Sequence, residues 1–378
     1  MIDKNVRGEG TNFNSTNNYM TQTSNGHLWV TDEDDLYKST NNGDTWAAQT
    51  TGATHNFTGI TSVGDRVFAT TANGTAGSQL LEFNGSSWSA RTTAQTSAGA
   101  LTGIWFVKNT LIITGDDGEV TRVWSISPFE QTWDSSDLTN ASKIFSFEHT
   151  HSISQVVDAG AVVLAACTDG NIYSIKDNAG TFILKGVTNI PFEEVYSIAA
   201  VEGLVFFGTK DMSKNVGRFY SSELAVADDL YVLANRQLIK EWDITGQDTT
   251  PKFMFASRDS VYVGIKESGT KSYLWRYYLP TGGIARDLKA GAGGFITSIT
   301  KSDNKFIVCV SNGDVFKETS TYETEGYLVT SAADFFTAES KQFVGAEIST
   351  KDLASNTSVE LYYSNNFEDL DTPDSTNY

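Results

Sequence analysis

Short runs of alternating or wholly apolar residues, separated by turns at Gly, Asp or Asn, follow one another along most of this chain. Residues 59–63 (GITSV), 66–72 (RVFATTA) and 79–83 (QLLEF) are three such runs, with turns at Gly64-Asp65 and Asn84-Gly85. Runs of this length with such boundaries predict β-strands. No stretch of ten or more residues has apolar positions at the helical period of 3.6 residues. The pattern therefore predicts an all-β protein.

Two kinds of strand alternate in these runs. One kind is apolar at nearly every position, as in LIITG, AVVLAAC, LVFFG and KFIVCV, which is typical of a strand buried on both faces. The other kind alternates, as where Val123 and Ser125 interleave with Trp124 and Ile126. The first kind predicts central strands of stacked sheets, and the second predicts strands with one wetter face.

A phrase of Ser or Thr followed by Trp or Phe recurs through the first half of the chain. It occurs at Thr45-Trp46, Ser87-Trp88, Thr132-Trp133 and Thr181-Phe182, with aromatic spacings of 42, 45 and 49 residues. Repetition at 40 to 50 residues is typical of a β-propeller, in which each four-stranded unit is one blade. We count about seven blades, with the aromatic phrase in the outermost strand, which places the third outermost strand at Thr132-Trp133. Six blades stay open, because the fifth unit carries extra length at residues 228–244.

The rhythm of the repeats also predicts the domain boundaries. Residues 1–16 are polar and predict a flexible N-terminal arm, residues 17–330 hold the propeller, and residues 331–378 form a C-terminal β segment, an incomplete sandwich at most. A ring of blades has to close, because a lone sheet leaves apolar faces exposed. We expect the segment EGYLVTSA, near residue 328, to supply the closing strand.

The turn at residues 39–46 resembles the aspartate box of sialidase-type and other propellers. It matches that pattern through Ser39, Asn41, Gly43, Thr45 and Trp46. The Asn side chain is expected to bond turn amides, the Gly to take a positive φ, and the Trp to fill the gap between strands. The resemblance supports a propeller, but the box is a folding device and gives little indication of sialidase activity.

Charge and cysteine content narrow the classes of partner. The net charge of −19 argues against nucleic acid, whose phosphates need clustered Lys and Arg, and against an anionic membrane surface. The sequence has no run of about 20 apolar residues, so we expect no transmembrane helix. Its N-terminus also lacks the apolar core of a signal peptide. Cys167 and Cys309 lie in apolar strands, which favours buried thiols over a disulfide.

Candidate chemical groups are present but scattered. A sialidase would need an arginine triad, a Tyr-Glu nucleophile pair and an acidic Asp, and only Glu193-Glu194-Val195-Tyr196 suggests part of that set; a solvated turn is the favoured interpretation of it. The arginines considered for the triad are Arg66, Arg91, Arg122, Arg218, Arg236, Arg258, Arg276 and Arg286.

Possible metal ligands have equally ordinary explanations. His149 and His151 share one face of an extended segment, but no third ligand follows at a metal-site spacing. The turns Asp116-Asp117-Gly118 and Asp32-Glu33-Asp34-Asp35 could hold calcium, although hairpin turns use the same residues. We therefore assign no catalytic, cofactor-binding or metal-binding residue, expect no cofactor, and interpret the tryptophans as core residues.

The C-terminal text DFFTAESKQFVGAEISTKDLASNTSVELYYS resembles a module of tailed-bacteriophage virion proteins, in which a β-sandwich follows a propeller. This resemblance covers about 45 residues. It implies a place in the tail, as a nozzle, tip, fibre or collar component, with several copies around a symmetry axis. The segment ends early for a complete sandwich, near Tyr378.

We therefore expect a non-enzymatic structural protein of a phage virion, made in the bacterial cytoplasm, with a propeller that serves as a rigid platform. Its expected partners are other virion proteins and copies of itself, with a host-surface glycan or receptor as a further candidate, and neither nucleic acid nor a membrane. Two alternatives stay open: a carbohydrate- or protein-binding propeller outside a virion, and a sialidase-like glycoside hydrolase.

Overall fold

The structure is a computed structural model. It describes residues 2–4, 18–53, 55–72, 78–92, 99–129, 142–290, 293–318 and 328–329.

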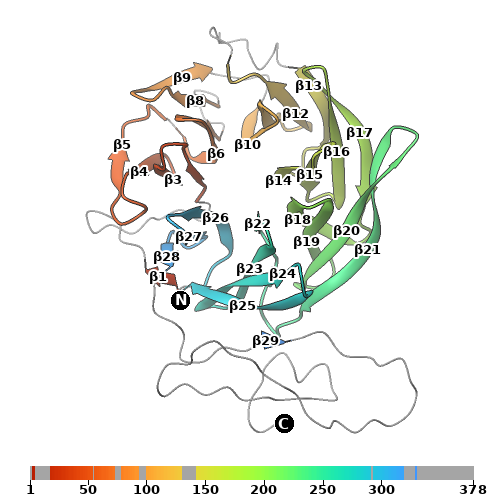
Figure 1. Cartoon of the computed structure of the whole chain (residues 1–378). Coiled ribbons are helices and arrows are strands. Elements are labelled where there is room, and N and C mark those ends of the chain that lie inside the picture. The colour runs from red at the N-terminus through yellow and green to blue at the C-terminus, as the bar shows by residue number, and fades with distance from the viewer. Residues whose placement is uncertain are drawn as a thin grey trace, which may run out of the picture.

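Seven antiparallel sheets stand around a central axis, which makes the chain a seven-bladed β-propeller (Figure 1). The predictions of an all-β fold and of about seven blades are confirmed, and the six-blade alternative is wrong. The described ranges contain strands and no helix, so none of these residues belongs to a helix that could cross a membrane.

Each blade is a simple up-and-down meander of strands. The first blade consists of β2 (Met20–Gln22), β3 (Leu28–Asp32), β4 (Asp35–Ser39) and β5 (Ala47–Gln49), and the second of β6 (Phe57–Val63), β7 (Arg66–Thr71), β8 (Leu80–Phe83) and β9 (Trp88–Thr92). The third consists of β10 (Ala100–Val107), β11 (Thr110–Asp116), β12 (Val120–Ile126) and β13 (Ser142–Glu148), and the fourth of β14 (Ile153–Asp158), β15 (Val163–Cys167), β16 (Asn171–Asn178) and β17 (Thr181–Asn189).

The remaining three blades depart from this regularity. The fifth consists of β18 (Glu193–Val201), β19 (Leu204–Asp211), β20 (Gly217–Ala227) and the long β21 (Leu230–Trp242). The sixth consists of β22 (Met254–Ser257), β23 (Ser260–Ser268), β24 (Lys271–Tyr278) and β25 (Gly283–Ala290), with β29 (Leu328–Val329) added at its edge. The seventh consists of β26 (Ile296–Ser302), β27 (Lys305–Val310), β28 (Val315–Glu318) and β1 (Ile2–Lys4).

The first strand of each blade lies nearest the central axis and the fourth lies at the rim (Figure 1). We call the end of the ring at which the innermost strands begin the upper face, and the opposite end the lower face. Because the strands alternate in direction, the turns after the first and third strands lie at the lower face. The turns after the second strands, and the links between blades, lie at the upper face.

The core lies between the blades. Each of seven buried clusters combines side chains of two neighbouring blades, as where Phe68 and Leu80 of the second blade meet Leu111 and Trp124 of the third. The second strands are nearly fully buried, and β15 is buried at all five positions, as their apolar sequences predicted. A blade is thus stabilised by its two neighbours, which is why the ring has to close.

The closing strand comes from the N-terminal end of the chain, and our expectation that the segment near residue 328 closes the ring is wrong. Strand β1 lies inside the expected arm at residues 1–16 and pairs antiparallel with β28, with Ile2 opposite Glu318. The segment near residue 328 forms β29, which pairs with β25 of the sixth blade. The outermost position of the seventh blade is thus filled by a strand from the N-terminal end of the chain. The sequence contains no local signal for this pairing.

The third blade corrects a second expectation. Its outermost strand is β13, which pairs with β12, rather than a strand at Thr132-Trp133. The buried Phe145 of β13 takes the core position that we had assigned to Trp133. Thr132-Trp133 and the C-terminal segment at residues 331–378 lie outside the described residues.

Candidate functional site

The turn at residues 39–46 has the local structure that its sequence predicts. Ser39 Oγ accepts a hydrogen bond from the Gly43 amide (2.9 Å), and Asn41 Oδ1 accepts one from the Thr45 amide (2.9 Å). Gly43 has a φ of +83°, which favours glycine. Trp46 is buried among residues of the first and seventh blades. The turn therefore joins β4 to β5 and locks two blades together, which is a structural role.

The tryptophans of the described chain mainly build the core, as predicted. Trp29, Trp46, Trp124, Trp242 and Trp275 are all buried. The two cysteines, at 167 and 309, are free and buried, also as predicted, and burial raises the pKa of both thiols.

The possible metal ligands do not come together. His149 is exposed in the turn that follows β13. In the other turn, Asp116 Oδ1 accepts the Gly118 amide (2.8 Å) and Asp117 Oδ1 accepts the Val120 amide (2.9 Å). Among the residues that the structure describes, no three His, Cys, Asp or Glu side chains are grouped as a metal site would require.

The arginines are distributed over different blades, and most of them form ion pairs within their own blade. Arg66 and Arg91 share the buried Glu82 of the second blade, and Arg286 pairs with Glu267 of the sixth (2.5 Å). Each of these guanidinium groups balances a carboxylate of its own blade. The described residues thus contain ion-paired arginines in place of the open triad that would bind a substrate carboxylate.

Glu193 is a buried centre of polar contacts, so the favoured interpretation of this segment as a solvated turn is wrong. Its carboxylate pairs with Arg218 (2.7 Å) and accepts hydrogen bonds from the hydroxyls of Tyr220 (2.8 Å) and Thr209. Arg218 also pairs with Glu241 (2.6 Å). The residue lies within β18 and ties together all four strands of the fifth blade at the upper face.

The neighbouring Glu194 and Tyr196 belong to a second group, which we call the upper-mouth cluster: Glu194, Tyr196, Lys252, Lys266 and Phe295. Tyr196 donates a hydrogen bond to Glu194 (2.8 Å). Lys252 Nζ lies 4.5 Å from the centre of the Phe295 ring and 5.5 Å from that of Tyr196, and Lys266 Nζ lies 5.2 Å from Phe295. The cluster therefore combines two half-buried aromatic rings with two ammonium groups, where the innermost strands of blades 5 to 7 begin.

The protonation of this cluster is shifted by burial and by its neighbours. Burial and the nearby Glu194 carboxylate raise the pKa of Tyr196, so its phenol stays protonated at neutral pH. Burial lowers the pKa of Lys252, and the charge of Lys210 lowers it further, while Asp248 and Glu194 oppose the shift. A protonated tyrosine beside lysines can bind polar or anionic groups, but it is a poor nucleophile.

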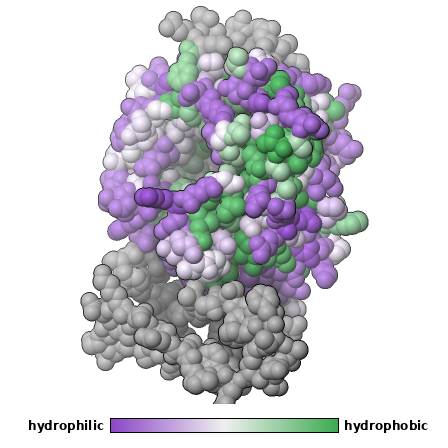
Figure 2. Space-filling view, turned by 45° about the vertical axis from the view of Figure 1, so that its right-hand side comes forward, coloured by the Kyte–Doolittle hydropathy of each residue, from purple (hydrophilic) through white to green (hydrophobic). Residues whose placement is uncertain are grey.

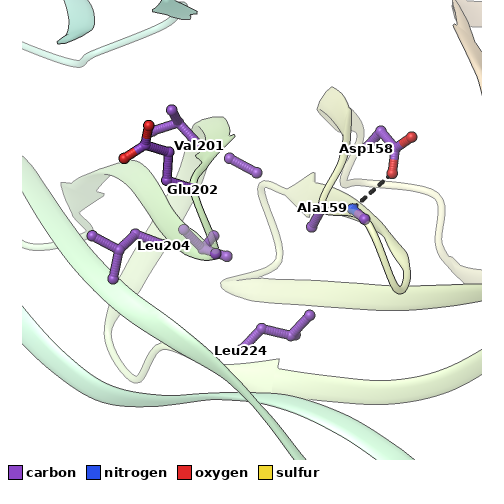
Figure 3. Close-up of a pocket in the computed structure, with 10 residues that line it drawn as sticks. Asp158, Ala159, Val201, Glu202, Leu204 and Leu224 are labelled. Carbon is purple, nitrogen blue, oxygen red and sulfur yellow. Dashed lines mark hydrogen bonds between the residues drawn. The ribbon is translucent and has the colours of Figure 1, made fainter. Parts of the chain in front are cut away.

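A pocket of about 370 Å³ opens on the lower face between the fourth and fifth blades. Its sides are the turn after β14, with Asp158 and Ala159, and the turn after β18, with Glu202 and Leu204 (Figure 3). Leu224 of β20 lines it from the rim. Leu224 belongs to the hairpin of β20 and β21, which contacts β17 of the neighbouring blade.

That hairpin is fastened to the fourth blade. Asp229 at its tip forms ion pairs with Lys176 (2.9 Å) and Lys185 (2.5 Å). The Leu233 amide donates a hydrogen bond to Thr188 Oγ1 (2.8 Å). Tyr231 is buried in the cluster between blades 4 and 5. The extra length of the fifth unit is therefore an arm that spans two blades (Figure 1).

The outer face of this arm is apolar although it meets solvent. Because Tyr231 and Leu233 point into the core cluster, the alternation of side chains turns Leu230 and Val232 outward. Their cross-strand partners are Ala227 and Ala225, which are also apolar. We call these four residues the arm patch.

Exposure values support the patch as a surface feature. Leu230 of the patch is 53% exposed. Figure 2 brings this side of the ring forward and shows a large apolar area bordered by polar residues. Contiguous exposed apolar surface of this kind is typical of protein–protein contacts.

Comparison with known proteins identifies the fold. No protein-family model matches the chain, and no curated protein matches it. Among solved structures, the WD40 β-propeller domain of Doa1 has a TM-score of 0.54 at 11% identity, covering 85% of this chain and 98% of that one. A chain of the mitotic checkpoint complex has a TM-score of 0.56 at 10% identity, with coverages of 84% and 93%.

Two further structures give the same result. Saccharomyces cerevisiae Sqt1 has a TM-score of 0.53 at 9% identity, covering 88% of this chain and 100% of that one. The computationally designed Ika8 protein has a TM-score of 0.52 at 13% identity, with coverages of 83% and 99%. The likeness is one of fold alone.

Sequence reasoning missed the arm patch and the upper-mouth cluster. The signal for the arm was present as ELAVADDLYVLAN, in which apolar residues occupy both faces of a hairpin. A hairpin with one solvent face would alternate with polar residues. No comparable signal marks the upper-mouth cluster, because its residues come from three different blades.

Proposed function

We propose that this chain is a non-catalytic structural protein of a tailed-bacteriophage virion, in which the propeller is a rigid platform for contacts with other proteins. The virion assignment rests on the resemblance of the C-terminal text to phage tail modules. In this proposal the chain is made in the bacterial cytoplasm and joins the tail in several copies.

One observation carries the assembly role: the arm patch. The fifth blade holds a 13-residue strand in a hairpin that is fixed at its tip, and the outward side of this hairpin is apolar. A fixed apolar surface loses little conformational entropy when a partner covers it, so it is suited to stable assembly. The net charge of −19 keeps the rest of the surface soluble.

The virion role is tested by quantitative mass spectrometry of purified particles of the phage that encodes this chain. We expect a fixed, small number of copies per particle, retained after density-gradient purification and a high-salt wash. Absence from particles, or copy numbers that fall with each purification step, would overturn the proposal.

A second candidate is recognition of a carbohydrate or an acidic group, inside or outside a virion. The upper-mouth cluster favours it, because aromatic rings stack on sugars and ammonium groups attract carboxylates. A glycan-array experiment with the wild-type chain and the Phe295→Ala variant tests it. We expect binding of acidic glycans that Phe295→Ala abolishes, and a blank array for the wild type would contradict this candidate.

The sialidase-like alternative has less support. The raised pKa of Tyr196 disfavours a phenolate nucleophile, and Arg218 is engaged by carboxylates of its own blade. A fluorogenic sialoside assay at micromolar protein provides the test: turnover that Tyr196→Phe abolishes would restore this alternative.

A further inference from the structure

Two lysines of the upper-mouth cluster carry positive charges that the described part of the chain does not neutralise. The ammonium groups of Lys252 and Lys266 lie 4.5 Å and 5.2 Å from the centre of the Phe295 ring. Within the described residues, neither ammonium group forms an ion pair. Burial lowers the pKa of Lys252 more than the charges of Asp248 and Glu194 raise it. Two positive charges therefore meet at one aromatic ring without an acidic partner of their own.

The two carboxylates that act on Lys252 from a distance are engaged by other groups. Asp248 forms an ion pair with Lys210 (3.0 Å). Glu194 accepts a hydrogen bond from the hydroxyl of Tyr196 (2.8 Å). Lys252 itself is accessible to solvent. An anion that arrives from outside the chain can therefore reach this lysine and neutralise it.

An exposed apolar pair, Phe192 and Met212, lies on the same face of the ring. Phe192 is 86% exposed and Met212 is 65% exposed, more than the other large apolar side chains in the described residues. The Met212 amide donates a hydrogen bond to the Phe192 carbonyl (3.0 Å). Phe192 has a φ of +64°, which bulky residues rarely adopt. Backbone strain of this kind is concentrated at functional sites, so the exposed ring is a candidate anchor for a partner.

The apolar pair and the upper-mouth cluster form one continuous surface. Glu194 of the cluster lies opposite Lys210 in the ladder of β18 and β19. Phe192 precedes Glu194 by two residues, at the upper end of this ladder. Met212 follows Lys210 by two residues, at the same end. We call the upper-mouth cluster together with Phe192 and Met212 the upper strip.

The upper strip has the length of a short peptide. It extends over the starts of the innermost strands of blades 5, 6 and 7, which begin at residues 193, 254 and 296. Packed sheets lie about 10 Å apart, so the strip is about 20 Å long, and roughly six extended residues at about 3.3 Å each would cover it.

The chemistry of the upper strip favours a peptide over other anions. A sugar acid could neutralise a lysine, but its hydroxyl groups would leave the apolar pair without an apolar partner. A nucleic acid is disfavoured by the net charge of −19. A peptide supplies both kinds of group, because carboxylates and large apolar side chains can follow one another along one extended segment.

We infer that the upper strip binds an extended, acidic segment of a partner protein, with an apolar side chain on Phe192 and Met212 and carboxylates beside Lys252 and Lys266. The inference deepens the proposed role as a platform for other proteins and rests on it. The acidic remainder of the surface repels such a segment, so the two lysines determine where it binds.

The first experiment selects ligands without assuming their sequence. A displayed library of random short peptides is panned on the immobilised full-length chain. Peptides retained equally well by the double variant Lys252→Gln, Lys266→Gln are then removed. We expect the enriched peptides to combine Asp or Glu with a large apolar residue. A library without enrichment, or an enrichment of basic or uncharged peptides, overturns the inference.

A second experiment measures the affinity of an enriched peptide by fluorescence anisotropy. Lys252→Gln should raise the dissociation constant about tenfold, because a charge-assisted contact is lost, and Lys252→Arg should largely preserve binding because it keeps the charge. Phe192→Ala should also raise the constant, because exposed aromatic anchors dominate such contacts. Added salt should weaken the binding, because it screens exposed charges.

Two matched controls lie at the lower face of the ring. Lys301 is exposed and lies over the Phe306 ring, 5.5 Å from its centre, as Lys252 lies over Phe295. Phe129, which follows β12, is 58% exposed. Lys301→Gln and Phe129→Ala should bind the peptide as the wild type does. Equal losses in the control and upper-strip variants, or no loss in the upper-strip variants, would contradict the inference.

The outcomes separate the inference from the proposed function. Binding of acidic glycans without selection of any peptide overturns the inference in favour of the carbohydrate candidate. If the chain is a stoichiometric component of particles but selects no acidic peptide, the virion proposal stands alone. Acidic peptides that depend on the upper strip, together with absence of the chain from particles, leave the inference standing and remove the virion proposal.

Discussion

The fifth and sixth blades both contain more chain than a four-stranded blade needs, and they use it in opposite ways. In the sixth blade, β29 pairs with the rim strand β25 and covers part of its edge. In the fifth blade, the added length extends β20 and β21 into an arm that reaches over the fourth blade. In the sixth blade another segment of the chain covers the rim strand, whereas in the fifth blade an apolar face of the arm is exposed to solvent. This difference is why we propose the fifth blade as the side that meets a partner.

The largest expected loss of stability comes from removing a feature that the two blades share. Each has a buried carboxylate that connects its rim strand to its inner strands. Glu193→Ala in the fifth blade and Glu267→Ala in the sixth should each lower the free energy of unfolding by about 3 kcal/mol, because a buried aromatic hydrogen-bond donor and a partly buried arginine lose their carboxylate partner. Chemical denaturation measures the change. Equal losses would show that the two blades differ at the rim alone, whereas a loss below about 1 kcal/mol in either blade would contradict the buried ion pair.

A smaller effect is expected from lifting the arm off the fourth blade. A Cβ at Gly186 would lie 2.0 Å from the Tyr231 carbonyl oxygen, so Gly186→Ala should force the two backbones apart. We expect a loss of about 1 to 3 kcal/mol and new proteolytic cleavage within residues 223–238. Gly269→Ala in the sixth blade is the control, because a Cβ there meets no atom within 4 Å. Equal stability of the two variants would mean that the arm does not depend on this close approach.

The tip of the arm should respond to acid. Its two lysine partners, Lys185 and Lys176, lower the pKa of Asp229 from 3.8 to about 2. A lowered carboxyl pKa contributes stability above the unfolded pKa that is lost as the pH falls through the folded one. We expect the protection of the tip amides, relative to their intrinsic exchange rates at each pH, to fall between about pH 4 and pH 2, and Asp229→Asn to show low protection throughout this range. Asp228→Asn, in the same turn, should behave as the wild type does.

The smallest effect concerns the covered edge of the sixth blade. Within the described residues, β29 pairs with Ile284 and Ala285. Truncation after Glu318 should therefore speed amide exchange at these two positions and leave the arm of the fifth blade unchanged. Exchange mass spectrometry on peptides from both blades gives the comparison, and unchanged exchange in the peptide that contains Ile284 would contradict a stable β29 contact.

Local pattern was enough to predict the elements that depend on neighbours in sequence. The apolar second strands, the turn that ends in Trp46 and the number of blades follow from side-chain alternation and from turn residues close to one another. The rest depends on distant partners. Ile2 pairs with Glu318, more than 300 residues away in the sequence. Glu193 forms an ion pair with Arg218 of another strand of its blade. The backbone of Tyr231 approaches Gly186 of the neighbouring blade closely. We predicted the outermost strand of the third blade at Trp133, whereas the strand that occupies this position contains Phe145.

The pairing of β1 with β28 has a consequence for how the protein is made. Translation delivers Ile2 first, but its partner strand ends at Glu318, so the N-terminal strand waits for about 300 further residues. At translation rates of about 5 to 20 residues per second, that interval lasts roughly 15 to 60 s. Six blades can stack on the ribosome during this time, while the ring stays open at the junction between its first and last blades. Strand β1 is thus made before the other described strands and is among the last to pair.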